Sequence, residues 1–228
     1  MIQTCNCENC ELKELFFHNV TEDEIKSLCT SKVEKNYDKG NFIIKEGEEI
    51  KEFIYLKSGL VKLYRTLTGK KEQVITIAKP FDFVSILSVF SDKYYNYSVT
   101  ALEESVTCVI DMNEVQNLIL ENGKFARDVL EKMSRISDKI ILESLEIRRR
   151  NLKGRVAFIL LYFANTIYQS QTLELPVSRK EIAEYIGMTT ENVIRCFTEF
   201  RRDNILKING KIIEISDLKR LEQISKLG

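Results

Sequence analysis

The stretch that most constrains the fold is Ser178 to Phe200, SRKEIAEYIGMTTENVIRCFTEF, which has the pattern of two short helices joined by a tight turn. Ser178 and Glu181 match a capping box, in which each side chain accepts a hydrogen bond from the other residue's backbone amide. Gly187 marks a helix end, because glycine readily adopts the left-handed conformation that closes a helix. Thr189 is a suitable cap for a second helix. The sequence therefore predicts a helix-turn-helix unit.

The predicted second helix has an apolar face and a polar face. Val193, Phe197 and Phe200 follow the spacing of a buried stripe. After the helix, Asn209-Gly210 separates two short alternating runs, the pattern of a β-hairpin with a type I′ turn. This order is typical of a winged helix-turn-helix, whose second helix docks in the DNA major groove. The candidate DNA contacts are Arg179, Thr189, Thr190, Glu191, Ile194, Arg195, Thr198 and, on the hairpin, Lys211.

Other interpretations of this unit stay open. Helix pairs with a short turn also occur in purely structural cores, and a winged helix can serve as a protein-interaction module. The salt dependence of binding distinguishes DNA from a protein partner. Contacts to DNA phosphates weaken steeply as the salt concentration rises, whereas an apolar protein contact does not. An enzyme is poorly supported, since His18 is the only histidine and the sequence has no Gly-rich phosphate loop, HExxH or GxSxG motif.

The charge is unevenly distributed, although 34 basic and 34 acidic residues balance over the 228 residues. Residues 145–228 hold 15 Lys and Arg against 10 Asp and Glu, a net charge of +5. Residues 1–144 hold the other 19 and 24, a net charge of −5. A basic C-terminal part is what binding to a phosphate backbone requires.

The sequence predicts a cytoplasmic protein without membrane contact. The first residues lack the basic start and apolar run of a signal peptide. The longest apolar stretch, Val156 to Ala164, is too short to cross a bilayer. In such a protein the six cysteines are expected to be thiols or metal ligands rather than disulfides.

Short β-like runs fill the region from Lys39 to Ile110. Regularly spaced strands with Gly and Pro between them predict an antiparallel barrel or a double-sheet roll, which encloses a pocket and suits a sensor. The runs are Phe42-Ile-Ile, Phe53-Ile-Tyr-Leu, Leu60-Val-Lys-Leu-Tyr, Gln73-Val-Ile-Thr-Ile and Ser98-Val-Thr-Ala-Leu.

One long helical pattern runs from about Phe125 to Lys153. Its apolar residues alternate spacings of four and three, which predicts the seam of a homodimeric coiled coil. An alternative is a helix packed on its own roll. Arg148, Arg149 and Arg150, followed by Gly154, mark a hinge, and such a run is usually a solvated face. The seam residues are Val129, Met133, Ile136, Ile140 and Ile147.

The order of β-roll, long helix and winged helix-turn-helix resembles the CRP/FNR (catabolite activator and fumarate-nitrate regulator) family of bacterial transcription factors over nearly the whole chain. The most specific match is Arg179-Lys-Glu-Ile-Ala-Glu-Tyr-Ile-Gly-Met-Thr-Thr-Glu191-Asn-Val-Ile-Arg195. The resemblance implies an α+β fold with a cyclic-nucleotide-binding-like jelly roll, homodimers, a two-fold symmetric operator and contact with RNA polymerase as an activator. The expected divisions are a Cys-containing segment at 1–20, a sensor roll at 21–124, a dimerisation helix at 125–153 and a DNA-binding domain at 154–228, with the motif at 179–198.

The resemblance also assigns roles on the second helix. Glu191 would accept from a cytosine amino group and Arg195 would donate to guanine, each worth roughly 1–3 kcal/mol of discrimination. Ile194 stands where the oxygen-sensing branch has Ser, and would touch a thymine methyl group. Two half-sites about one helical turn apart are the expected target.

The resemblance also bears on the signal that the roll would sense. In the cyclic-nucleotide branch the roll carries a Glu for the ribose and an Arg-Ser pair for the phosphate. This chain has Ile86 and Tyr95-Asn96 at those places, so we expect no tight binding of cAMP.

The oxygen-sensing branch instead holds an iron–sulfur cluster. Aligned with it, Cys7, Cys10 and Cys108 fall on ligand positions, but the remaining ligand falls on Phe16, so Cys5 would have to substitute. Four thiolates suit a 4Fe-4S cluster, whereas the same thiols could bind zinc or no metal, with Cys108 a plain core residue. All three outcomes stay open, including a zinc-binding or small-molecule regulator without a cluster.

Overall fold

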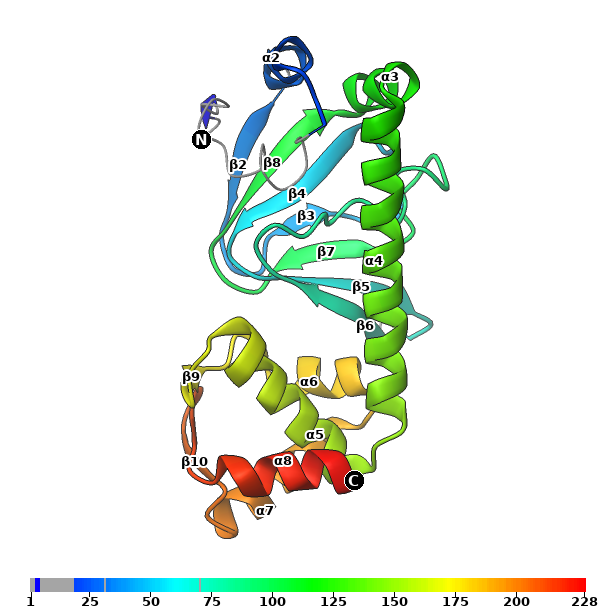
Figure 1. Ribbon diagram of the computed structural model, residues 1–228. Coiled ribbons are helices and arrows are strands. Elements are labelled where there is room, and N and C mark those ends of the chain that lie inside the picture. The colour runs from blue at the N-terminus through cyan, green and yellow to red at the C-terminus, as the bar shows by residue number, and fades with distance from the viewer. Residues whose placement is uncertain (1–2, 5–18, 31, 70) are drawn as a thin grey trace. The chain divides into compact units, whose positions relative to one another are not determined.

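The computed structural model describes residues 3–4, 19–30, 32–69 and 71–228. These residues form an α+β protein of two compact units (Figure 1). One unit comprises Met1–Arg65 and Ile75–Lys139, and the other comprises Thr66–Val74 and Ile140–Gly228. No helix in the described part of the chain is both long and apolar enough to cross a membrane.

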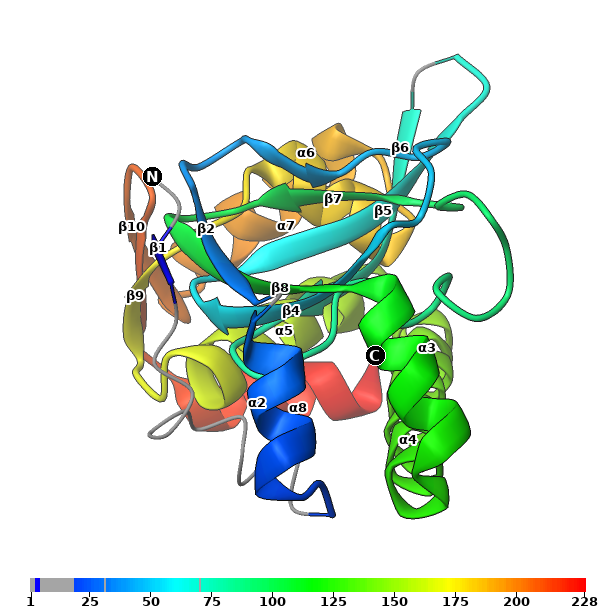
Figure 2. The same cartoon turned by 90° about the horizontal axis from the view of Figure 1, so that it is seen from above.

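The first unit is built around two four-stranded antiparallel sheets, ordered β1-β2-β8-β4 and β3-β7-β5-β6. Only the tip of the β5–β6 hairpin, Thr66–Val74, is assigned to the second unit. Seen from above, β8 and β4 lie in one layer and β7 and β5 in the other (Figure 2). The predicted β-roll is therefore confirmed. The strands are β1 Gln3–Thr4, β2 Val33–Tyr37, β3 Phe42–Ile44, β4 Glu52–Ser58, β5 Val61–Leu67, β6 Lys71–Ala78, β7 Ser98–Ala101 and β8 Ser105–Asp111.

The turn between β4 and β5 shows why glycine is needed there. Gly59 has a φ of +90°, and a Cβ atom on it would lie 2.3 Å from the Ser105 Oγ and 2.5 Å from the Glu104 carbonyl oxygen. Glycine is the residue that accepts both the positive φ and this close approach. The close packing of this turn against the start of β8 joins the two sheets at one end of the roll.

Three helices accompany the roll: α2 Glu22–Thr30, α3 Met112–Glu121 and α4 Gly123–Arg148. Asn122 separates the last two, and its side-chain oxygen accepts hydrogen bonds from the backbone amides of Lys124 and Phe125 at 3.1 and 3.0 Å. Phe125 and Val129 on α4 then enter an apolar core that includes Phe53 and Phe83 of the roll. The long helix thus begins at a defined cap and lies against the roll.

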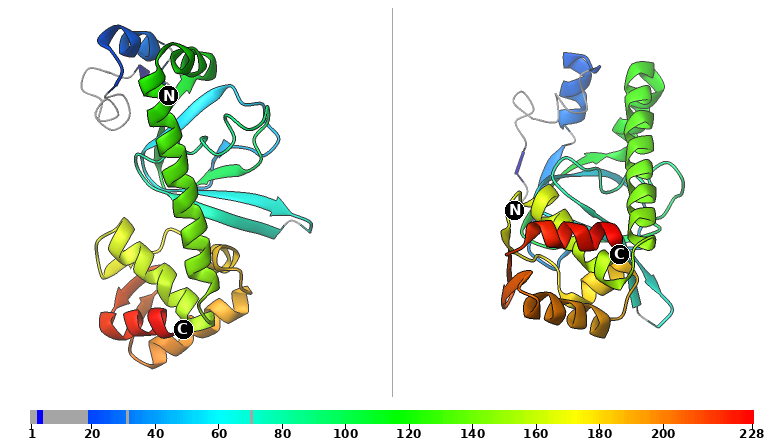
Figure 3. Two further views of the ribbon diagram at one scale, coloured as in Figure 1. Left: turned by 45° about the vertical axis from the view of Figure 1, so that its right-hand side comes forward. Right: turned by 60° about the horizontal axis from the view of Figure 1, so that its bottom comes forward.

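The second unit holds the C-terminal helices and a three-stranded sheet ordered β10-β11-β9. Helix α8 packs along α5, as both views in Figure 3 show. The elements are α5 Leu152–Leu161, a π-helical turn at Tyr162–Ile167, β9 Thr172–Glu174, α6 Arg179–Ile186, α7 Thr190–Arg202, β10 Leu206–Asn209, β11 Ile212–Ile215 and α8 Leu218–Leu227.

The long helical pattern ends earlier than expected. Helix α4 stops at Arg148 rather than near Lys153. Asn151 begins a new helix instead, because its side-chain oxygen accepts a hydrogen bond from the Gly154 amide at 3.0 Å. Asparagine is a favoured N-terminal cap, and its cap position ends the preceding helical run.

Candidate nucleic-acid interface

The capping box that begins α6 is formed as predicted. The Ser178 amide donates to the Glu181 carboxylate at 2.8 Å, and the Glu181 amide donates to the Ser178 hydroxyl at 3.2 Å. Gly187 ends the helix in the left-handed conformation, with φ +66° and ψ +45°. The Met188 amide then donates to the Ala183 carbonyl at 2.9 Å, so the chain turns sharply toward α7.

Helix α7 starts at the cap residue Thr189, and one of its faces is buried. The Asn192 amide donates to the Thr189 hydroxyl at 3.3 Å. Val193, Phe197 and Phe200 are buried, as their spacing predicts. An ion pair of 2.7 Å between Lys153 on α5 and Glu199 on α7 adds a polar link to the supporting helix.

The opposite face of α7 is exposed. Ile194 is half exposed, although it is a large apolar residue that burial would stabilise. The Thr198 hydroxyl is satisfied by its own helix, donating to the Ile194 carbonyl at 3.0 Å. The side chains gathered on this surface of α7 are Glu191, Ile194, Arg195 and Thr198 at exposed positions, with Thr190 half-buried beside them.

Glu191 and Arg195 have complementary chemistry on this surface. Hydrogen bonds from its own backbone amide and from the Thr189 hydroxyl lower the pKa of Glu191, so its carboxylate stays an acceptor at neutral pH. The Arg195 guanidinium donates to the Asn192 side-chain oxygen at 3.0 Å, which leaves most of its donors facing outward. One helix face therefore offers an anionic acceptor and a cationic donor one turn apart.

Arg179, at the start of α6, lies against α7. Its guanidinium carbon is 3.6 Å from the centre of the Phe197 ring, a stacked arrangement in which the ring covers one face of the cation. Burial lowers the pKa of Arg179, but an arginine remains charged at neutral pH. The side chain is half-buried, so it stands at the edge of the surface rather than in its centre.

The hairpin after α7 forms, but its turn lies one residue later than predicted. Asn209 pairs with Ile212, so the two turn residues are Gly210 and Lys211. Gly210 has a φ of +62°, and Lys211 has no positive φ. A type I′ turn needs positive φ at both positions, so the expected turn type is wrong. Lys211 consequently stands exposed at the tip of the hairpin.

The heptad stripe on α4 packs within its own chain. Val129 is 3% exposed in the core of the first unit, and Met133 and Ile136 pack against that core. Ile147 is also buried, and Ile140 is half-buried. Packing on the core of the first unit accounts for Val129, Met133 and Ile136. That the five-residue stripe forms a dimer seam stays a prediction.

Another set of apolar side chains on α4 is exposed. Leu142 and Leu145 are 60% and 55% exposed, Ile141 stands beside them, and Leu130 lies further back along the helix. We call Leu130, Ile141, Leu142 and Leu145 the outer face of α4. The heptad pattern in the sequence did not predict this exposed apolar face, because its four residues lie at other positions of the heptad.

Buried apolar side chains from both sheets pack together inside the roll. Tyr95 and Tyr97 are buried with ring centres 6.3 Å apart. The Tyr95 hydroxyl donates to the Glu52 carbonyl at 3.0 Å, and the Tyr97 hydroxyl donates to the Val84 carbonyl at 2.9 Å. Burial raises the pKa of both phenols, which keeps them as neutral donors. Ile86, which stands where the cyclic-nucleotide branch has its ribose-binding Glu, is fully buried.

Of the candidate metal ligands, only Cys108 lies within the described residues, and Cys5, Cys7 and Cys10 fall outside them. Cys108 is a fully buried thiol on β8. Its sulfur is 3.8 Å from a carboxylate oxygen of Glu34, which also pairs with Lys57 at 2.6 Å. Among the described residues, no three Cys, His, Asp or Glu side chains converge as a metal site.

Two family models match the chain. The cyclic nucleotide-binding domain matches residues 34–122, and the Crp-like helix-turn-helix domain matches residues 154–224. The Fumarate and nitrate reduction regulatory protein of Yersinia pestis is 25% identical over 228 residues, spanning 96% of this chain and 90% of the relative. Transcriptional activator protein anr of Pseudomonas aeruginosa is 25% identical over 218 residues, spanning 93% and 89%.

Solved structures share the fold at lower identity. A transcriptional regulator of the crp/fnr family from Eubacterium rectale has a TM-score of 0.79 at 19% identity, covering 92% of this chain and 97% of that one. FixK2 from Bradyrhizobium japonicum has a TM-score of 0.73 at 22% identity, covering 85% and 96%. The roll, the long helix and the winged helix-turn-helix therefore recur together as one chain architecture.

Proposed function

The chain belongs to the CRP/FNR family of DNA-binding transcriptional regulators, which are transcription factors rather than enzymes, and from this we propose that it acts as a homodimer on a two-fold symmetric operator. Residues 154–228 would read DNA, residues 125–153 would mediate dimerisation, and residues 21–124 would form the sensor. As an activator it would contact RNA polymerase, in keeping with the name of its Pseudomonas relative.

The observation that carries the proposal is the exposed face of α7. Glu191 presents an ionised acceptor that suits a cytosine amino group, and Arg195 presents donors that suit guanine O6 and N7. Ile194 lies between them as an apolar contact for a thymine methyl group. Thr189, Thr190, Thr198, Arg179 and Lys211 surround these three as candidates for phosphate contacts.

Selection from a random pool of duplex DNA tests the proposal. We expect the bound fraction to converge on two inverted half-sites about one helical turn apart, each containing a G·C pair. The affinity for the selected duplex should fall steeply with salt, because phosphate contacts release counterions. A pool that remains random, with retention insensitive to salt, would instead favour a protein-interaction module.

The outer face of α4 is the surface we propose for the partner copy. Leu142 and Leu145 are exposed on successive turns of the helix, and Ile141 extends the same apolar surface. Exposed leucines at i and i+3 suit an isologous contact in which the same face of two helices meets about a two-fold axis. Dimerisation is typical of the family, which supports a second copy of this chain as the partner.

We expect the protein not to bind cyclic nucleotides tightly. The roll lacks an acid at Ile86 and a cation at Tyr95-Asn96, and both tyrosines at 95 and 97 already use their hydroxyls within the roll. Isothermal titration calorimetry with cAMP and cGMP should give no saturation at micromolar ligand. Micromolar saturation with a stoichiometry near one per chain would contradict this prediction.

For the signal we propose a metal-thiolate centre, and a 4Fe-4S cluster in particular. Such a cluster needs four thiolates, which Cys5, Cys7, Cys10 and Cys108 would supply, and when bound it supplies an oxygen-labile redox centre. Cys108 is the ligand position that lies within the described residues, and Lys57 partly offsets the negative charge that Glu34 places beside it. The similarity to regulators of fumarate and nitrate reduction supports this choice over zinc.

Anaerobic purification should therefore yield a brown protein. We expect stoichiometric iron and sulfide, little zinc, and a visible absorbance that bleaches in air. Cys108→Ala should lower the iron content, whereas Cys196→Ala, which removes a buried thiol on α7, should leave it unchanged. A colourless protein with stoichiometric zinc would show that the thiolates bind zinc and not an iron–sulfur cluster. A metal-free protein would contradict both metal sites.

A further inference from the structure

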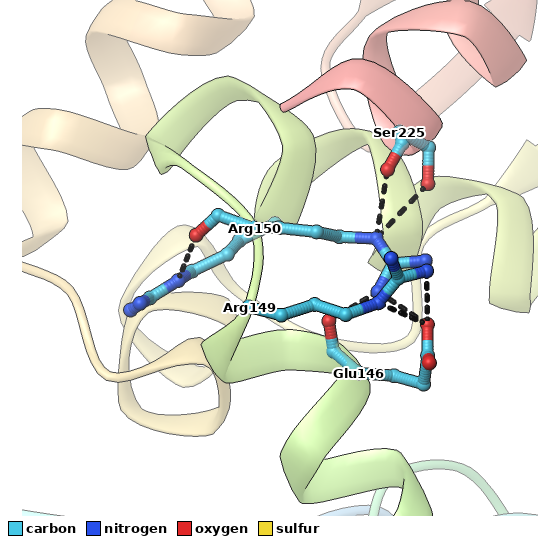
Figure 4. A network of polar contacts seen from close by, with 5 residues as sticks. Glu146, Arg149, Arg150 and Ser225 are labelled. Carbon is cyan, nitrogen blue, oxygen red and sulfur yellow. Dashed lines mark hydrogen bonds and ion pairs between the residues drawn. The ribbon is translucent and has the colours of Figure 1, made fainter.

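The corner between α4 and α5 is closed by a buried arginine. The Arg150 side chain is 7% exposed, although it belongs to a run of three arginines expected to be solvated. Its guanidinium donates to the Glu146 carbonyl and, through Nε, to the Ser225 carbonyl at 2.8 Å (Figure 4). It also pairs with the Glu146 carboxylate at 2.7 Å and lies 4.5 Å from the centre of the Phe158 ring.

Both carbonyls that accept from Arg150 lie at the C-terminal end of a helix. Glu146 is in the last turn of α4, and Ser225 is in the last turn of α8. Helix C-terminal carbonyls have no partner within their own helix and carry partial negative charge, so one planar guanidinium can satisfy both ends at once. Arg150 thereby fastens the end of α4 to the end of the C-terminal helix.

Arg155 makes a second connection from the same corner. Its Nε donates to the Arg150 carbonyl at 2.9 Å, and its Nη2 donates to the Arg148 carbonyl at 3.2 Å. Its Nη1 reaches the Ile186 carbonyl at 3.1 Å, at the end of α6. The corner is also closely packed at Gly154, where a Cβ atom would lie 3.0 Å from the Gly228 Cα and 3.2 Å from the Arg150 Cβ.

These contacts join the last turns of α4 to the helix-turn-helix as one body. Residues 140–148 of α4 belong to the same compact unit as α5 to α8. The break at residues 149–151, which the sequence marks as a hinge, is thus spanned by hydrogen bonds from Arg150 and Arg155, of which the bond to the Ser225 carbonyl is buried. Residues 140–148 of α4 are therefore held in a fixed direction relative to the reading face of α7.

We propose that Arg150 is a specificity-determining residue for the spacing between the two half-sites of the operator. This rests on the proposed function, in which two copies meet along α4 and each copy reads one half-site. With the corner locked, the separation and relative rotation of the two α7 helices follow from the α4 contact. A rigid pair tolerates a changed spacing poorly, since each base pair adds about 3.4 Å and about a tenth of a helical turn.

Arg150→Met tests this, because methionine keeps an apolar stem on Phe158 but has no donor for the two carbonyls. The selected operator is compared with versions whose centre is two base pairs longer or shorter, by fluorescence anisotropy at one salt concentration. We expect the wild type to bind the altered operators at least about tenfold more weakly, a loss typical of a poorly engaged half-site. In the variant this ratio should approach one, while affinity for a single half-site duplex is unchanged.

Arg149→Met is the matched control. Arg149 pairs with the same Glu146 carboxylate at 2.8 Å, but its side chain is 57% exposed and reaches no helix-end carbonyl in the described network. This variant should keep the spacing discrimination of the wild type. Loss of discrimination in both variants would assign the effect to the Glu146 charge and overturn the role of Arg150.

Arg150→Lys provides a second test if the methionine variant melts at a much lower temperature. Lysine keeps the charge but cannot hold two carbonyls with a planar fork, so discrimination should fall between wild type and Arg150→Met. Unchanged discrimination in a folded, dimeric Arg150 variant overturns the inference while the proposed function stands. A wild-type protein that binds no paired half-sites contradicts the proposed function itself.

Discussion

Leu145→Asp is expected to convert the protein to a monomer and to abolish tight operator binding. A carboxylate on the outer face of α4 would be desolvated on pairing, which is strongly unfavourable. Because the two half-sites would then be bound separately, we expect the apparent affinity for the selected operator to fall roughly 10²–10⁴-fold. Sedimentation velocity gives the oligomeric state, and fluorescence anisotropy gives the affinity.

Two comparisons isolate the dimer contact in this experiment. Leu145 is exposed, so its substitution should leave the melting temperature of the monomer and the affinity for one half-site nearly unchanged. Arg135→Asp makes a larger change in charge on an exposed part of the same helix, where Arg135 pairs only with Glu131 among the described contacts. That control should remain dimeric, and a dimeric Leu145→Asp protein would move the interface to another surface.

Arg195→Ala is expected to remove sequence discrimination while leaving the fold and the dimer intact. A bidentate contact between arginine and guanine is worth about 1–3 kcal/mol, and the variant loses one in each half-site. We therefore expect operator affinity to fall roughly 30-fold or more, toward the affinity for unrelated DNA. Competition binding against operators substituted at the G·C pair measures the loss directly, since the variant should no longer distinguish them.

Lys211→Ala gives the contrasting result. Lys211 stands at the tip of the hairpin, where a side chain meets the phosphate backbone rather than base edges. Its loss should weaken binding to all sequences alike and reduce the slope of log affinity against log salt by about one per half-site. Retained discrimination in Arg195→Ala would place base reading on other residues of α7.

Local rules predicted the helix-turn-helix almost residue by residue. The Ser178–Glu181 capping box, the left-handed Gly187 and the Thr189 cap each depend on neighbours within four positions, so the sequence contains all the information they need. The hairpin was predicted, but its turn is displaced by one residue. Pairing of Asn209 with Ile212 sets the register, and that pairing also depends on β9, which the sequence did not reveal.

Contacts between residues far apart in the chain determine two features that the sequence did not predict, the packing of Val129 on its own roll and the burial of Arg150. A heptad stripe shows that one face of α4 is buried, but not whether a partner or the same chain buries it, and Val129 packs on its own roll. Arg150 looks like a surface residue beside Arg148 and Arg149. Its burial depends on Ser225, 75 positions away, and no local pattern links the two.

The stack of Arg179 on Phe197 bears on the entropy of association. A flexible surface cation loses about 0.5–1.5 kcal/mol of rotamer freedom when a ligand immobilises it. The Arg179 guanidinium, 3.6 Å from the ring centre, is already confined before DNA arrives, whereas the neighbouring Lys180 is largely exposed. A phosphate contact made by Arg179 would therefore cost less ordering than one made by Lys180, and the aromatic residue beneath it would contribute to affinity without touching DNA.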